Sequence, residues 1–290
     1  MKGLSSFEPL MKKIVFVLLM LSLAFPLAAQ DRLAVSRVGV LPKEAEGTSS
    51  LFFLDGDLWT CNDHGQLRLY ALDTLTAKVT ATVDLGVTVY DLEEVTQDDR
   101  YLYFGDFGDN SGTRTDLRIL RLAKGDFRRG RYRFDTIVFT YPDRAADLLA
   151  RNFDCEAFAA VGDSLYLFTK QWVSQGSTCY VLPKAPGRHV ARQQFSFSSR
   201  GLVTGACYLP TSHSMVLVGY NITLQPFVCV LTDFDGKGFG SVQRKPLDTP
   251  LGTQAEGTAS RDGKTFFITN ETFSMAFVSR KAALQKIIIN

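Results

Sequence analysis

The chain has few of the side chains on which most metal and nucleophile chemistry depends. Its 290 residues include three histidines and five cysteines, and no Cys-x-x-Cys or Cys/His spacing suggests zinc. The GxSxG, HExxH, Walker and GxGxxG patterns of hydrolases, zinc proteases, nucleotide-binding loops and dinucleotide folds do not occur. The sequence therefore predicts none of these kinds of site.

An excess of charge of either sign is also lacking. Residues 1–29 hold three lysines and one glutamate, so the 32 basic and 30 acidic residues of the chain become equal in number without them. The basic run at residues 128–133 falls at a predicted turn, where charged side chains are solvated. Because no basic surface is indicated, we expect no nucleic-acid partner.

Long apolar runs are confined to the start of the chain. Residues 11–30 begin with two lysines after Met11, continue as an apolar stretch and end on small residues, which is the pattern of a secretory signal peptide. We therefore expect residues 1–30 to be a signal peptide, with Met11 as a second candidate start and a signal anchor as the alternative. No later segment approaches 18 consecutive apolar residues. The mature chain, residues 31–290, is expected to be one exported, periplasmic or extracellular domain without a transmembrane segment, and a monomer.

The cysteines are odd in number, so at least one thiol of an exported protein stays unpaired. Their positions on predicted strands favour buried small apolar side chains. Disulfides between Cys155 and Cys179 or between Cys207 and Cys229 remain the alternative. The five positions are Cys61, Cys155, Cys179, Cys207 and Cys229.

One short motif recurs along the chain and predicts the fold. It reads EAEGT, DLEEV, DCEAF, TGACY and QAEGT, and its successive centres lie 47, 63, 50 and 50 residues apart, at Glu46, Glu93, Glu156, Ala206 and Glu256. Each copy is followed by a turn and a second apolar run, and two further alternating runs complete most units. Units of this length, each with four strands, predict an all-β, closed β-propeller.

The count of units predicts five blades. The segment after Glu256 is too short for a full unit, whereas residues 31–45 supply the missing length and contain an alternating run. We therefore expect the N-terminal strand to complete the last blade and so remove an exposed sheet edge. Six blades are the alternative, if the 63-residue unit holds an extra element.

Polar side chains are predicted to converge on one mouth of the central channel. In a propeller, the start of each first strand and the end of each second strand lie on the same face. The residues at these positions are Glu46, Glu93, Glu156, Glu256, Asn62, Asp63, Asp106, Asp109, Asn110, Lys170, Asn221, Asn270 and Glu271.

So many carboxylates around one channel repel each other unless a cation, raised pKa values or Lys170 with a cationic ligand compensates them. Oxygen ligands suit Ca²⁺ or another divalent cation. The predicted metal ligands are Glu46, Glu93, Glu156, Glu256, Asp106, Asp109, Asn110 and Asn270. The alternative is a structural ring in which these side chains cap turns.

Several of these motifs resemble a group of uncharacterised bacterial secreted β-propellers. The resemblance rests on the DxE motifs at Asp91–Glu93 and Asp154–Glu156 and on the GDxGDN stretch at residues 105–110. More remotely, the chain is similar to phytase-like and gluconolactonase-type propellers. This resemblance implies divalent metal at the mouth and hydrolysis of phosphoesters or lactones, although the fourth motif has Ala206 in place of Glu.

Two functions are consistent with these residues. The first is a non-catalytic protein that binds a small molecule, glycan, peptide or envelope protein, with Trp172, Asn221 and Glu271 as ligand-binding candidates and Tyr90 and Phe273 as further aromatic surface. The second is a metal-dependent hydrolase of the lactonase or phosphoesterase type, with Glu156, Glu93 and Lys170 as catalytic candidates. The sequence favours the first slightly, because no complete set of nucleophile and base is visible.

Overall fold

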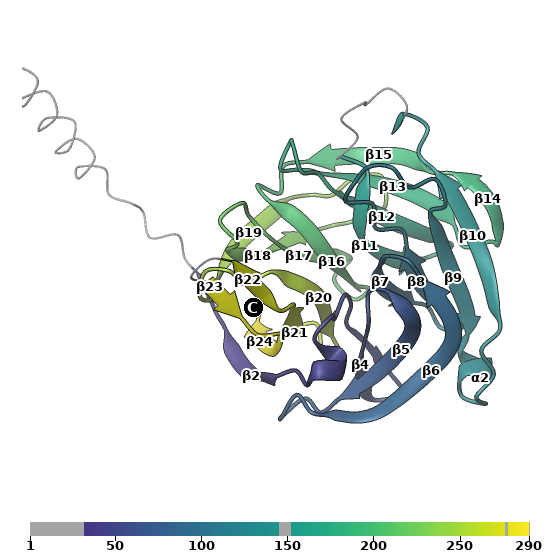
Figure 1. Ribbon diagram of the computed structural model, residues 1–290. Helices are drawn as coiled ribbons and strands as arrows, with labels where there is room; N and C mark the ends of the chain where they lie inside the picture. Colours follow the sequence, from purple (N-terminus) through teal and green to yellow (C-terminus); the bar gives the residue numbers. More distant parts are fainter. Residues whose placement is uncertain (1–31, 145–151, 276–277, 290) are drawn as a thin grey trace, which may run out of the picture. The chain divides into compact units, whose positions relative to one another are not determined.

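Five antiparallel sheets arranged in a ring form the fold (Figure 1), a five-bladed β-propeller as predicted. The structure is a computed structural model that describes residues 32–144, 152–275 and 278–289. The predicted signal peptide falls outside these residues. Short helical segments occur at η1 (Lys43–Ala45) and α2 (Lys124–Phe127). No helix in the described part of the chain has the length and apolar character needed to cross a membrane.

Four antiparallel strands make up each blade, and the first strand of each blade lies innermost. Blade 1 contains β3 (Phe52–Leu54), β4 (Asp57–Cys61), β5 (Gly65–Leu72) and β6 (Val79–Val89). Blade 2 contains β7 (Leu92–Gln97), β8 (Tyr101–Asp106), β9 (Arg118–Ala123) and β10 (Phe134–Thr140). Blade 3 contains β11 (Asp154–Val161), β12 (Ser164–Lys170), β13 (Ser177–Pro183) and β15 (Arg192–Phe197).

Blade 4 is formed by consecutive strands, whereas blade 5 uses strands from both ends of the chain. Blade 4 contains β16 (Leu202–Leu209), β17 (Ser214–Tyr220), β18 (Pro226–Leu231) and β19 (Val242–Asp248). Blade 5 contains β20 (Ala255–Ser260), β21 (Thr265–Asn270), β24 (Ala283–Ile288) and β2 (Ser36–Val40). Outside this pattern, β1 (Leu33–Ala34) and β14 (Gly187–Val190) pair in parallel with β19 and β10, and β22 (Phe273–Met275) pairs with β23 (Val278–Arg280).

The N-terminal strand closes the ring. β2 pairs antiparallel with β24, with Ser36 opposite Lys286 and Val40 opposite Ala283. The strand therefore covers the edge of blade 5, which would otherwise expose unpaired backbone groups. This confirms the predicted closure, and five blades account for the ring without a sixth.

Tight hairpin turns connect the innermost strand of several blades to the second strand and favour their antiparallel pairing. Between β3 and β4, Asp55 and Gly56 adopt positive φ angles of 51° and 101°, which suit a tight turn between twisted strands. The turns before β12 and β21 place Gly162 and Gly263 at positive φ. Apolar side chains from neighbouring blades then pack together into the five core clusters of the ring.

All five cysteines are free thiols, and four of them are buried. Burial raises the pKa of Cys61 and that of Cys229 to about 12. Their interpretation as small apolar side chains is therefore confirmed for four of the five, and neither of the two disulfides considered from the sequence forms.

The innermost strands approach one another so closely that a glycine is required at Gly257. A Cβ atom added there would lie 2.4 Å from the carbonyl carbon of Ser50 in the neighbouring blade. We expect Gly257→Ala to lower the free energy of unfolding by about 1–3 kcal/mol, because the core cannot absorb the overlap without backbone shifts. Urea denaturation would measure this, with Gly238→Ala as the control, since nothing lies within 4 Å of a Cβ at Gly238. Equal stability of the two variants would contradict this view of the packing.

Candidate ligand-binding site

A β-bulge near the start of the innermost strands determines which side chains reach the channel mouth. The ladder register skips Glu93 in β7, Glu156 in β11 and Thr204 in β16. In β20 it skips the segment between Ala255 and Thr258 that contains Glu256. A bulge adds one unpaired residue and redirects its side chain. Three of the predicted glutamates, Glu93, Glu156 and Glu256, therefore occupy equivalent positions.

The repeat positions Glu46 and Ala206 are not equivalent to those of the three glutamates. Thr48 pairs with Asn62 in the way that Ala255 pairs with Asn270, so Ser49 stands where blade 5 has Glu256. Glu46 lies three residues earlier, exposed at the end of η1. In blade 4 the bulged residue is Thr204 and not Ala206. The structure thus does not bring Glu46 together with the other three glutamates.

Lys170 and seven carboxyl groups surround the mouth. These carboxyl groups interact electrostatically with one another. They belong to Asp63, Asp91, Glu93, Asp154, Glu156, Glu256 and Glu271. Lys170 ends β12 and is buried, and its Nζ lies 2.5 Å from Glu156 Oε1. Burial acts to lower the pKa of Lys170, but the charge of Glu156 and the other groups around it raises that pKa well above its ordinary value.

Aromatic rings complete the surroundings of the Lys170 ammonium. Its Nζ lies 4.7 Å from the ring centre of Trp172 and 5.7 Å from that of Tyr220. Both distances are in the range of cation–π attraction. Trp172 is held in place because its Nε1 donates a hydrogen bond to Asp154 Oδ2 at 3.0 Å. The ammonium group of Lys170 is therefore surrounded by both carboxylates and aromatic faces.

One lysine does not compensate the remaining acidic groups. Burial, then the charges of neighbouring carboxylates, raise the pKa of Glu93 and of Glu256 well above the ordinary value. Burial and the charge of Asp63 raise the pKa of Glu271 to about 7. The pKa of Asp91 is raised by burial and by the charge of Asp154. These shifts mean that burial and mutual repulsion disfavour the ionised form of these carboxyl groups, which a bound cation would stabilise.

The acidic residues of the GDxGDN stretch have structural partners instead. Asp106 is fully buried and accepts from Arg114 Nη2 at 3.1 Å and Arg118 Nε at 2.8 Å. Asp109 accepts from the backbone N–H of Thr113 and pairs with Arg144. Asn110 is exposed. These contacts match the structural alternative considered from the sequence, in which such residues stabilise loops.

The predicted amide residues likewise stabilise turns at the ends of second strands. Asn62 donates to the backbone oxygen of Gln66. Asn221 Oδ1 accepts from the backbone N–H of Thr223 at 3.0 Å. Asn270 is buried, donates to Lys281 O and accepts from Gln285. Each of these amides therefore has a structural role.

Two further aromatic residues were predicted to offer stacking surface. Tyr90 is exposed, and the Arg118 guanidinium lies 5.4 Å from its ring centre. Phe273 starts the β22–β23 hairpin and is half-buried. Tyr90 therefore presents a ring to solvent next to blade 2.

The carboxyl groups do not form a ready-made metal site. Among the residues that the structure describes, no three His, Cys, Asp or Glu side chains are arranged to hold a metal ion. Lys170 already neutralises Glu156 at this mouth.

Glu94 is a buried carboxyl group that the sequence pattern did not single out. Its Oε2 accepts from the backbone N–H of Ala206, and its Oε1 from that of Val95, both at 3.0 Å. The side chain thus crosses from blade 2 to blade 4, and burial raises its pKa well above the ordinary value. A second glutamate directly after Glu93 in the DLEEV motif was the available signal. At the end of the innermost strands opposite the mouth, there is a cavity of about 650 Å³.

Comparisons with known proteins give weak likenesses. No protein-family model matches the chain, and no curated protein resembles it in sequence. The PQQ-bound aldose sugar dehydrogenase of Streptomyces coelicolor is 11% identical, with 87% of this chain and 98% of that chain covered and a TM-score of 0.47. The computationally designed Ika4 protein is 12% identical, with 73% and 98% covered and a TM-score of 0.33. At these values neither likeness assigns a ligand or an activity to this chain.

Proposed function

We propose that this chain is a ligand-binding protein whose acidic mouth binds the positively charged group of a small molecule. The carrying observation is the excess of carboxyl groups over Lys170 at a buried mouth, where burial and then the charges of neighbouring carboxylates raise the pKa values of Glu93, Glu256 and Glu271. Perturbed groups of this kind cluster at functional sites. A bound cation would remove the repulsion among them.

The surroundings of Lys170 indicate the class of ligand. Its ammonium contacts Glu156, and Trp172 and Tyr220 present their rings to it. Carboxylates combined with aromatic faces recognise primary and quaternary ammonium groups. Amines, and glycans or peptides that carry an amino group, are therefore the proposed ligands. An envelope protein would bind through the same kind of group.

Calorimetry with a panel of amines would test the proposal. We expect spermidine or choline to bind wild type, with binding that weakens as ionic strength rises. Glu256→Gln should weaken binding at least tenfold, since it removes a buried carboxylate from the mouth. Glu46→Gln is the matched control, because Glu46 is exposed and apart from the mouth. The absence of binding by any amine, or equal loss in both variants, would contradict the proposal.

Calcium is the second candidate for the cation, as the sequence predicted. The charge of the mouth favours it, but its carboxylates would have to move closer together to bind one ion. Elemental analysis of the purified chain, with thermal melts in calcium and in EDTA, distinguishes the two. Stoichiometric metal and an EDTA-sensitive melt would replace the amine proposal by a calcium site.

A metal-dependent hydrolase remains the alternative activity. The feature that favours it is Glu271, whose pKa of about 7 suits a general base at neutral pH. Assays with lactones and phosphoesters in the presence of calcium would test it. Turnover that disappears in Glu271→Gln while metal content stays unchanged would establish this alternative.

Export of the chain is part of the proposal. The predicted signal peptide at residues 1–30 supports it, and the ligand would then be met in the periplasm or outside the cell. Sequencing the N-terminus of the mature protein from cell fractions would test the cleavage near residue 30.

A further inference from the structure

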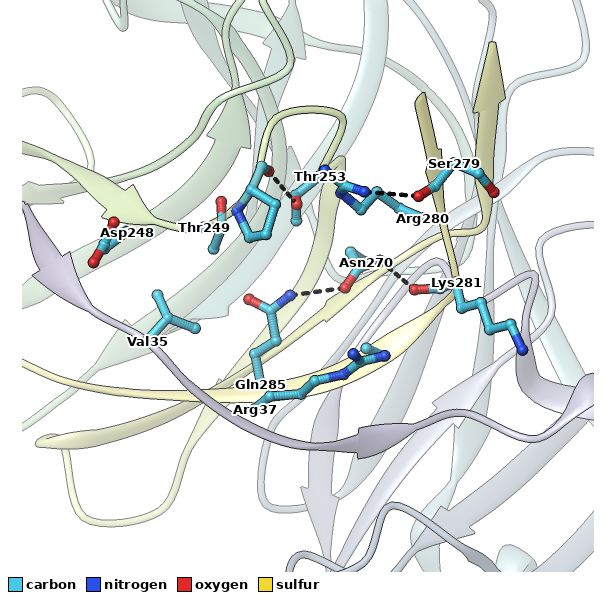
Figure 2. Close-up of a pocket in the computed structure, with 12 residues that line it drawn as sticks. Val35, Arg37, Asp248, Thr249, Thr253, Asn270, Ser279, Arg280, Lys281 and Gln285 are labelled. Atoms are coloured by element: carbon cyan, nitrogen blue, oxygen red, sulfur yellow. Dashed lines mark hydrogen bonds between the residues drawn. The ribbon is translucent and has the colours of Figure 1, made fainter. Parts of the chain in front are cut away.

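A second cavity lies between blades 4 and 5, apart from the acidic residues of the mouth. Its volume is about 420 Å³. The N-terminal segment around β2, the connection from β19 to β20 and the strands β23 and β24 contribute its walls (Figure 2). The cavity therefore depends on the N-terminal strand that closes the ring.

Cationic side chains dominate this cavity. Arg37, Arg280 and Lys281 line it, and Asp248 is the one acidic residue among the lining residues. In Figure 2, Asp248 lies on the opposite side of the Asn270–Gln285 pair from Lys281. Within the described part of the chain, none of the three cationic side chains forms an ion pair. Their charge is thus available to a ligand.

One hydrogen-bond donor in the cavity also lacks a partner among the described residues. Arg280 Nε is buried and has no hydrogen-bond partner among the described residues. Nη1 of this guanidinium donates to the carbonyl oxygen of Ser279 at 2.8 Å. A buried donor without an acceptor costs about 1–3 kcal/mol. An acceptor supplied by a ligand would satisfy it.

Two amide side chains of the cavity, Asn270 and Gln285, are engaged in hydrogen bonds within its walls. Gln285 Nε2 donates to Asn270 Oδ1 at 2.8 Å, and Asn270 Nδ2 donates to the carbonyl oxygen of Lys281 at 3.1 Å (Figure 2). These bonds fix the two amides against β24 and orient the backbone before it. With three cationic side chains against the single carboxylate of Asp248, the lining carries net positive charge, which favours an anionic ligand.

We propose that this cavity binds the carboxylate or phosphate group of a small organic anion through Arg37, Arg280 and Lys281. Guanidinium groups match the paired oxygens of both anions, and the lysine adds a point charge. The site is separate from the cation-binding mouth and does not require that mouth to be functional.

Calorimetric titration with inorganic phosphate and with citrate, at constant ionic strength, tests the site. We expect one equivalent of anion to bind wild type, and the stronger of the two probes identifies phosphate or carboxylate as the preferred group. Arg280→Gln should weaken that binding at least tenfold. Arg131→Gln is the matched control, since Arg131 is exposed on the loop after α2 and outside the cavity.

Two further variants keep the test decisive. Lys281→Gln changes an exposed side chain and should weaken binding severalfold even if Arg280→Gln fails to fold. Glu256→Gln should leave anion binding unchanged, so failure of the mouth proposal and failure of this one are distinguishable. No binding of either probe at millimolar concentration, or equal binding by wild type and the Lys281→Gln variant, would overturn the proposal.

Discussion

Replacing Lys170 by methionine is expected to lower the free energy of unfolding by about 3–5 kcal/mol, the usual loss when one partner of a buried ion pair is removed. Lys170 Nζ lies 2.5 Å from Glu156 Oε1, and both side chains are almost completely buried. Methionine keeps the apolar volume but leaves Glu156 without a cation. The carboxylates of Asp154 and Glu256, whose charges also act on Lys170, lose the same partner.

Urea denaturation at pH 8 would measure this loss, since the carboxyl groups ionise more fully there. Lys245→Met is the control, because Lys245 is exposed on β19 and its replacement should change stability by less than about 0.5 kcal/mol. The double variant Lys170→Met with Glu156→Leu should recover much of the loss, since it removes the buried charge as well. A Lys170→Met variant as stable as the control would show that the pair contributes nothing to the fold.

The blade pattern could be predicted because it depends on short-range signals. Alternating apolar residues and turns such as Asp55–Gly56 specify hairpins locally, and the motif spacing then counts the units. The closing strand followed from the same counting, because the length after Glu256 was too short for a blade. Pairing of β2 with β24 confirmed an argument that used only strand length and edge protection.

The positions at the mouth were predicted less well because they depend on register. The EAEGT and QAEGT motifs match in four of five letters. Nevertheless, Thr48 and Ala255 are the residues that pair equivalently, so Glu46 is displaced by three residues. Bulges at Glu93 and Glu156 arise from pairing with a second strand, and one strand's sequence does not reveal them.

Asp106 was predicted as a metal ligand, but in the structure it pairs with arginine side chains. Its carboxylate is neutralised by Arg114 and Arg118, which stand in the following loop and at the start of the next strand. The GDxGDN motif includes Asp106 but does not include the arginines that contact it. Asp91 and Glu94 were passed over for the opposite reason, since their importance comes from burial and from contacts across the ring.

The stability of this protein is expected to fall as pH rises from about 5 to 8. Glu271 has an ordinary pKa of 4.5 when unfolded and about 7 when folded, so the folded state holds more protons between these values. The free energy of unfolding then decreases with pH through this window. For Glu271 alone the loss is on the order of 3 kcal/mol, and the raised pKa values of Glu93 and Glu256 act in the same direction.

Thermal melts of wild type and Glu271→Gln from pH 5 to 8 would measure the effect. The glutamine cannot ionise, so the variant should melt roughly 5–10 °C above wild type at pH 8 and close to it at pH 5. Glu46→Gln should keep the wild-type pH dependence, because Glu46 is exposed. If Glu271→Gln and wild type melt in parallel across this range, Glu271 is not part of a repulsive cluster. The excess charge proposed to attract a cationic ligand would then have to reside in the other carboxyl groups of the mouth.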